Sequence, residues 1–124
     1  MDHEEELTGE VIGAAIEVHR VLGPGLLESV YQTCLEQECK LRGIPIQPLV
    51  RLPLIYKGVL LRDEFVLDFY ALGRLVVELK AVEKLVPVHE AQLLTYLRLT
   101  NTRVGLLINF NVPVLKNGLK RMVN

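Results

Sequence analysis

Three charged residues interrupt two apolar stretches of this sequence. Asp68 lies within FVLDFY at 65–70, and Glu78 and Lys80 lie within LVVELKAV at 75–82. Both stretches have the texture of β-strands, where an aspartate has low propensity and is costly to bury. Carboxylates are ligands for a hard divalent cation, and a neighbouring lysine can hold a hydroxide or stabilise an anionic transition state. The three residue types therefore predict metal-assisted chemistry, provided that the fold brings them together.

Whether these charges meet depends on the turn that joins the two strands. Glu78 and Lys80 are two apart and share a face. A two-residue loop at 72–73 points Glu78 away from Asp68, whereas a three-residue loop centred on Gly73, or a bulge there, pairs the two carboxylates directly. Directly opposed carboxylates repel, which a cation such as Mg²⁺ or Mn²⁺ would relieve. The alternative is that Glu78 and Lys80 lie on a solvated face and Asp68 pairs with an arginine.

Further polar residues lie on predicted helices. His89, Gln92 and Tyr96 form one stripe on a helix predicted over 88–100. For His89 we favour the simple interpretation, a residue on the wet side of an amphipathic helix. Gln92 and Tyr96 border the apolar stripe, which is less typical of solvent-facing residues. Glu28 begins another helix, where the helix dipole alone favours a carboxylate.

Two helices are predicted before the strands. The first opens at 7–9 with Thr8 as its N-cap and ends at 23–25. The second covers 26–42, with Gly43 as its C-cap. The residues expected on its buried face are Leu27, Val30, Cys34, Leu35 and Leu41.

Strands are predicted at 46–56, 64–71, 75–82 and 103–110, with a turn at Lys57-Gly58, the helix 88–100 before the last strand, and a final strand or short helix after Gly118. Pro48 and Pro53 favour an edge or bent strand over a central one for the first strand. Alternation puts Phe65, Leu67 and Phe69 on one face of the second. The order predicts an α+β or α/β sandwich.

Composition limits the classes of function. The 124 residues contain fourteen Lys and Arg against fifteen Asp and Glu, a net charge of −1. Proteins that coat nucleic acid carry a large basic excess, so this class is excluded, although a local basic groove is not. Half of the residues are hydrophobic, and there is no repeat or linker. We therefore predict one domain over 1–124, with residues 1–6 as a flexible N-terminus.

The sequence predicts a cytoplasmic location and no membrane segment. The N-terminus is acidic where a signal peptide is basic, and the longest apolar run, 104–108, is far below the ~20 residues that span a bilayer. Cys34 and Cys39 lie about 140° apart around a predicted helix. A disulfide between them is therefore not expected, which fits a reducing compartment.

The ordered motifs resemble a known nuclease superfamily. Asp68, followed ten residues later by Glu78-Leu79-Lys80, resembles the D…(D/E)xK signature of the PD-(D/E)xK nucleases. GLLESVY at 25–31 resembles the motif that names the GxxExxY family, a branch of that superfamily. Phrases at 12–19, 77–82, 89–97 and 105–110 also resemble that branch. The resemblance implies a restriction-endonuclease-like αβββαβ core with a mixed central sheet flanked by helices, and an extra N-terminal helix.

The resemblance also implies a metal site. Asp68, Glu78 and the backbone carbonyl of Leu79 would bind Mg²⁺ or Mn²⁺. Glu28 would approach the metal or a water molecule on it. The implied function is metal-dependent hydrolysis of nucleic-acid phosphodiester bonds.

Three more residues complete the implied catalytic set. Lys80 would position or activate the attacking water. Gln92 and Tyr96 match helix residues that line such sites and orient the lysine or a substrate phosphate.

Nucleic acid, DNA rather than RNA, is the partner that this function implies. Candidate phosphate contacts are Lys57, Arg62, Lys84 and Arg98, although solubilising charge is the simpler interpretation of each. A second hypothesis is a catalytically silent module with the same fold that binds nucleic acid or protein, favoured by the low positive charge. A third is a structural subunit, because a mean hydropathy of +0.29 indicates covered apolar surface, most simply in a homodimer.

Overall fold

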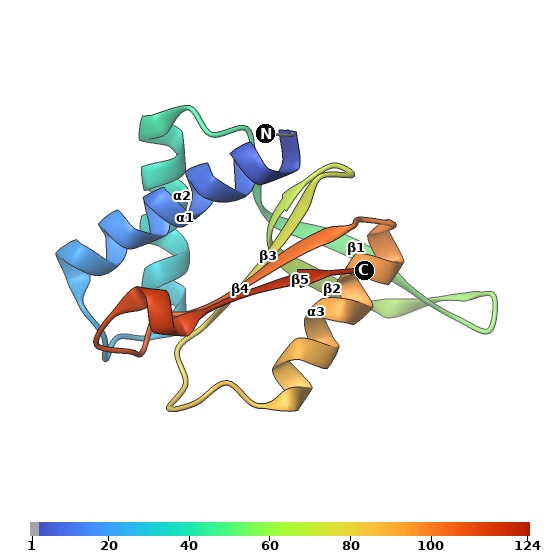
Figure 1. The fold of residues 1–124 in the computed structure, drawn as a ribbon. Helices are drawn as coiled ribbons and strands as arrows, with labels where there is room; N and C mark the ends of the chain where they lie inside the picture. Colours follow the sequence, from blue (N-terminus) through green and yellow to red (C-terminus); the bar gives the residue numbers. More distant parts are fainter. Residues whose placement is uncertain (1–2) are drawn as a thin grey trace.

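The computed structural model describes residues 3–124, which form three helices, a short 3-10 helix and five strands (Figure 1). The elements are α1 (His3–Leu22), α2 (Glu28–Arg42), β1 (Gln47–Tyr56), β2 (Val59–Ala71), β3 (Leu75–Lys80), α3 (Pro87–Thr100), β4 (Val104–Asn109), η1 (Leu115–Gly118) and β5 (Leu119–Val123). The strands form one sheet in the order β1-β2-β3-β4-β5. Neighbours are antiparallel except β3 and β4, which are parallel with α3 as their crossover. The predicted α+β class, with a mixed sheet between helices, is confirmed.

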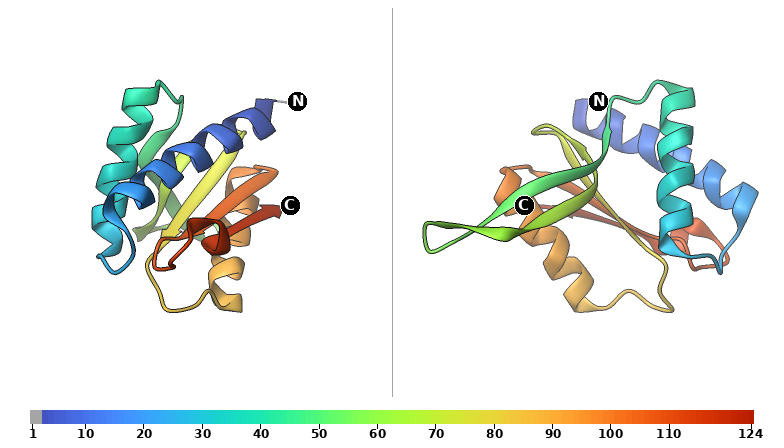
Figure 2. Two further views of the ribbon diagram at one scale, coloured as in Figure 1. Left: turned by 60° about the vertical axis from the view of Figure 1, so that its left-hand side comes forward. Right: turned by 180° about the vertical axis from the view of Figure 1, so that it is seen from behind.

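The helices cover both faces of the sheet. Figure 2 shows α1 and α2 on one side and α3 on the other. Val77 and Leu79 of β3 belong to the core cluster under α1 and α2, whereas Val76 belongs to the cluster under α3. Because side chains alternate along a strand, Glu78 and Lys80 point to the α3 side.

In the described residues, no helix is both long and apolar enough to cross a membrane.

The helix ends differ from the prediction at one place. Helix α1 already begins at His3, and Thr8 is buried within it instead of capping it. Acidic residues such as Glu5 and Glu6 suit a first turn, which allows the earlier start. Residues 1–2 of the predicted flexible N-terminus lie outside the described residues. Gly43 ends α2 as predicted, with φ 65° and its N–H bonded to the last turn.

The buried face of α2 matches the prediction only in part, because Leu35 is buried as predicted whereas Val30 is 37% exposed. Tyr31, Leu35 and Cys39 are buried, at a spacing of four. Leu27 and Leu41 are 74% and 71% exposed, so their predicted burial was wrong. The spacing of the aliphatic residues was misleading because the Tyr31 ring occupies the buried face of α2. Its hydroxyl donates to the backbone carbonyl of Gly23.

Strands β1 and β2 form a long hairpin that projects from the body of the molecule (Figure 2). Its turn is Lys57-Gly58, as predicted, with φ 50° and 80°. Strand β1 is an edge strand, as its prolines predict. Strand β2 begins at Val59, before the predicted start at 64, because residues 59–64 pair with β1 in the hairpin. This outer half of β2 has no pairing with β3.

Strand β2 changes face in its middle. Leu67 packs in the cluster under α3, whereas Phe69 packs under α1 and α2. The prediction that both share one face was therefore wrong. Between their partners on β1, Leu49 has a left-handed φ of 50°, which breaks the regular alternation of the strand pair. Asp68 lies at this break.

Candidate active site

The loop between β2 and β3 sets the carboxylates opposite one another. The ladder pairs Ala71 with Leu75 and Phe69 with Val77, which leaves a three-residue loop at 72–74. Gly73 has the left-handed φ of 70° that such a loop requires. The three-residue alternative is confirmed, and the next pair in this register joins Asp68 to Glu78.

At this pair the backbone ladder gives way to side-chain contacts. Glu78 Oε1 accepts the Asp68 N–H at 3.2 Å, and Asp68 Oδ2 accepts the Leu79 N–H at 2.7 Å. Strands β2 and β3 therefore separate here into a fork that both carboxyl groups fill. Glu78 is only 4% exposed, so the alternative of a solvated face was wrong for this residue.

The Leu79 carbonyl faces the same fork. The N–H and C=O of a strand residue point to the same edge of the strand, because paired residues exchange both bonds. The Leu79 N–H points to Asp68. The next carbonyl, of Lys80, accepts from Phe110 after β4 and so points to the opposite edge.

Burial raises the pKa of all three carboxyl groups around the fork, and the charge of Asp68 adds to this effect at Glu78 and Glu28. Burial, followed by the charge of Asp68, raises the pKa of Glu78 to about 8. Burial also raises the pKa of Asp68, against the opposing effects of the Leu79 N–H and the Lys80 charge. Glu28 is exposed as a whole residue, yet burial of its carboxyl group, followed by the charge of Asp68, raises its pKa. Each group therefore resists ionisation in this buried setting.

A hard divalent cation fits this donor chemistry. Carboxylate oxygens are the ligands that Mg²⁺ and Mn²⁺ prefer. The positive charge of either ion would remove the repulsion between Asp68 and Glu78. Among the described residues, no three His, Cys, Asp or Glu side chains converge as a ready set of ligands. The fit therefore rests on this carboxylate pair and on the oxygens nearby.

A chain of hydrogen bonds holds Lys80 beside the carboxylates. Lys80 Nζ donates to Gln92 Oε1 at 2.8 Å, and Gln92 Nε2 donates to the Tyr96 hydroxyl at 3.2 Å. Tyr96 is buried, and its ring packs edge-on against Phe65 at 5.9 Å. His89 is separate from this chain, because its Nδ1 accepts the Val86 N–H at the start of α3.

An open cavity of about 350 Å³ adjoins the fork, lined by Glu28, Ser29, Gln32, Leu49 and Asp68. Sequence reasoning did not select Gln32, whose Nε2 donates to the Asp68 carbonyl at 3.2 Å. Its position four residues after Glu28 puts both on one face of α2, a signal that could have identified it.

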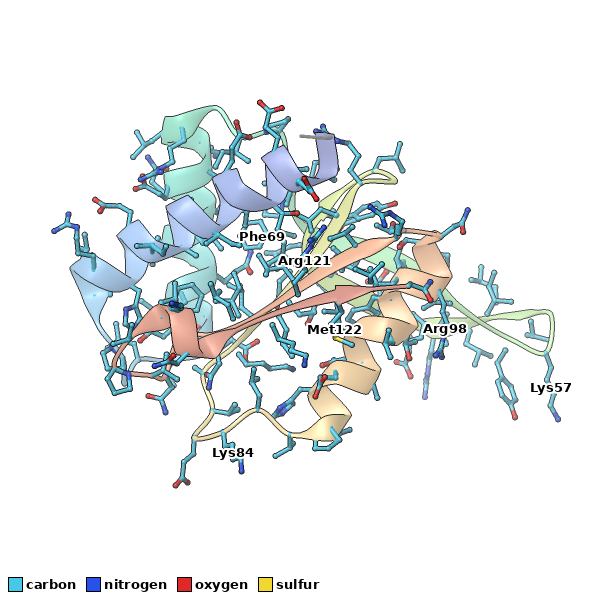
Figure 3. All side chains as sticks on the ribbon, in the orientation of Figure 1. Lys57, Phe69, Lys84, Arg98, Arg121 and Met122 are labelled. Carbon is cyan, nitrogen blue, oxygen red and sulfur yellow. The ribbon has the colours of Figure 1, made fainter. Side chains whose placement is uncertain are left out.

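The predicted phosphate contacts do not gather in one place. Lys57 is at the tip of the hairpin, Lys84 in the loop after β3, and Arg98 on α3 (Figure 3). Arg62 lies on the outer half of β2, and all four are exposed. In Figure 3, Lys57 and Lys84 lie at widely separated ends of the molecule. Lys84, four residues after Lys80, is the nearest of the four to the fork in sequence.

Comparison with known families agrees with this fold. The family model described as the PD-(D/E)XK nuclease superfamily matches residues 5–122. No curated protein and no solved structure gives a significant match. PD-(D/E)XK nucleases generally use divalent metal ions. Because the match covers almost the whole chain, the protein belongs to the PD-(D/E)XK nuclease superfamily.

Proposed function

We propose that this protein is a metal-dependent nuclease, acting on DNA rather than RNA, with the fork between β2 and β3 as its active site. One observation carries the proposal: two buried carboxyl groups, Asp68 and Glu78, meet where Lys80 is held by hydrogen bonds. Buried charges that only stabilise a fold are normally paired with opposite charges. Two carboxyl groups buried side by side are therefore rarely kept for stability. Membership of a nuclease superfamily supports the same activity.

The residues divide into a cation-binding part and a charge-offsetting part. Asp68, Glu78 and the Leu79 carbonyl would bind Mg²⁺ or Mn²⁺, with Glu28 near them. When bound, the cation polarises a phosphoryl oxygen and lowers the pKa of water. Lys80 offsets the negative charge that develops on the phosphoryl group, which makes it a catalytic residue in this proposal.

Gln92 and Tyr96 act on Lys80 as positioning residues. Gln92 Oε1 fixes the ammonium group, and the Tyr96 hydroxyl fixes the Gln92 amide. Because the Tyr96 ring is packed in the core, the chain of hydrogen bonds starts from a rigid point.

Cleavage by a lysine variant tests the proposal. Labelled single-stranded DNA, duplex DNA and RNA are incubated with wild-type protein in Mg²⁺ or Mn²⁺, with and without chelator. We expect cleavage that chelator stops, that Lys80→Met abolishes and that the matched exposed variant Lys40→Met retains. Cleavage that persists in Lys80→Met would remove the lysine from the mechanism. Bound but uncleaved nucleic acid would favour the silent module.

The same proposal includes the finer assignments from the sequence. We assign the chain to the GxxExxY branch, treat residues 1–124 as one domain and locate its activity in the cytoplasm. A homodimer is supported by exposed apolar side chains at the hairpin, including Ile55, Tyr56 and Leu60. Sedimentation at micromolar concentration tests the dimer, and a monomer there would refute it.

A further inference from the structure

Gln32 has a side-chain orientation that the structure fixes. Its Nε2 donates to the carbonyl oxygen of Asp68 at 3.2 Å. The reversed amide would set two oxygen acceptors against each other, so the nitrogen must face Asp68. The other end of the amide, Oε1, is therefore an acceptor.

This oxygen is buried without a hydrogen-bond partner. Among the described residues, Gln32 Oε1 is the one buried side-chain polar atom that has none. Burial of an unsatisfied acceptor costs free energy, which native proteins rarely accept without a reason. Ligand binding is such a reason here, because a ligand bound in the proposed active site would give this oxygen its missing partner.

The surroundings of Gln32 indicate which ligand that is. Gln32 lines the cavity with Glu28 and Asp68. With a cation bound, these carboxyl groups are ionised, and an ionised carboxylate is an acceptor that cannot satisfy another acceptor. A divalent cation can, because hard cations bind amide oxygens as well as carboxylates.

We propose that Gln32 Oε1 is a further oxygen ligand of the divalent cation bound at Asp68 and Glu78. The inference rests on the proposed function and adds a residue to its cation site. Gln32 thereby has two functions on one amide: the nitrogen holds the backbone of Asp68, and the oxygen binds the cation.

Calorimetric titration of the 124-residue chain with Mn²⁺ alone, then with Mg²⁺ alone, separates these functions. Gln32→Met removes both ends of the amide, and we expect binding weaker by about 10-fold or more. Gln32→Glu loses the nitrogen donor but keeps an oxygen, so it should bind at least as tightly as wild type. Gln37→Met, the same change at an exposed position of α2, should bind like wild type.

Each contrary result has its own meaning. Wild-type affinity in Gln32→Met overturns the inference, and so does binding by Gln32→Glu as weak as in Gln32→Met. If Asp68→Asn loses Mn²⁺ while Gln32→Met retains it, the inference about Gln32 fails and the proposed function stands. If wild-type protein binds neither ion, both fail. Thermal unfolding without metal checks that each variant folds.

Discussion

Strand β2 has two halves that both contain apolar residues but have different surroundings. In the inner half Leu67 is fully buried, whereas in the outer half Leu60 is 68% exposed. The outer half pairs with β1 alone, and the inner half lies in the sheet between helices. Apolar residues are thus poor guides to burial here. A buried polar residue is more informative, because Asp68 and Glu78 are costly to bury and keep their places through specific contacts.

The largest effect should separate two aspartates on this one strand. Asp68→Asn removes a charge at the fork, and we expect DNA cleavage to fall by more than the roughly 10- to 100-fold typical of groups that only orient ligands. Asp63→Asn makes the same change on the exposed outer half and should retain wild-type activity. Steady-state cleavage rates measure both. Equal losses in the two variants would break the distinction between the halves.

Truncation of two leucines should sharpen the same comparison. Leu67→Ala leaves a cavity under α3, which should lower the free energy of unfolding by about 2–5 kcal/mol. Leu60→Ala changes an exposed side chain, and we expect a change within about 0.5 kcal/mol. Urea unfolding gives both values. A large loss in Leu60→Ala would indicate that another chain covers the hairpin.

The pH dependence of stability should report the buried carboxyl group of Glu78. Its pKa is raised from 4.5 to about 8 in the folded protein, so the folded state binds more protons than the unfolded state between these values. The contribution to stability is therefore full below pH 4.5 and is lost as the pH rises through 8.

Glu78→Gln should flatten this decline, since an amide does not titrate. Thermal unfolding of metal-free protein across this pH range measures it. Saturating Mn²⁺ should also reduce the decline in wild type, because a cation favours the ionised carboxylate. A decline that is equally steep in Glu78→Gln would assign it to other groups.

The smallest effect is expected at the end of the hydrogen-bond chain. Tyr96→Phe removes the hydroxyl that holds Gln92, a contact of about 0.5–1.5 kcal/mol, so kcat should fall by roughly 2- to 10-fold with little change in KM. Tyr56→Phe, on the exposed hairpin, should leave kcat unchanged. A change in KM alone would place Tyr96 in substrate binding instead of in positioning the lysine.

The sequence was sufficient for the order of elements and for the residues of the fork. It left the loop between β2 and β3 open, because two- and three-residue loops are both compatible with Gly73. The choice depends on pairing across the sheet, where the three-residue loop sets Asp68 opposite Glu78. That register follows from tertiary packing, which local propensity does not contain.

The predicted face of α2 was wrong in part, and that of β2 was wrong, because both depend on contacts between distant parts of the chain. The buried face of α2 follows Tyr31, whose ring stacks on Phe110 at 4.5 Å, a contact between distant parts of the chain. The change of face in β2 accompanies the left-handed backbone conformation of Leu49 on the partner strand. A leucine rarely adopts this conformation, and no sequence rule predicts it. Gln32 was missed because its significance depends on an unmet oxygen that only the packed structure reveals.

Cation binding and cleavage, measured on the same samples, decide whether the fork is the active site of a metal-dependent nuclease. Wild-type protein and Glu78→Gln are titrated with Mn²⁺ and Mg²⁺ by calorimetry, and each sample is then assayed on labelled DNA and RNA. We expect that wild type binds a divalent cation and cleaves nucleic acid, and that Glu78→Gln loses both. Cleavage by Glu78→Gln at the wild-type rate, or a wild-type protein that binds no cation, would contradict it.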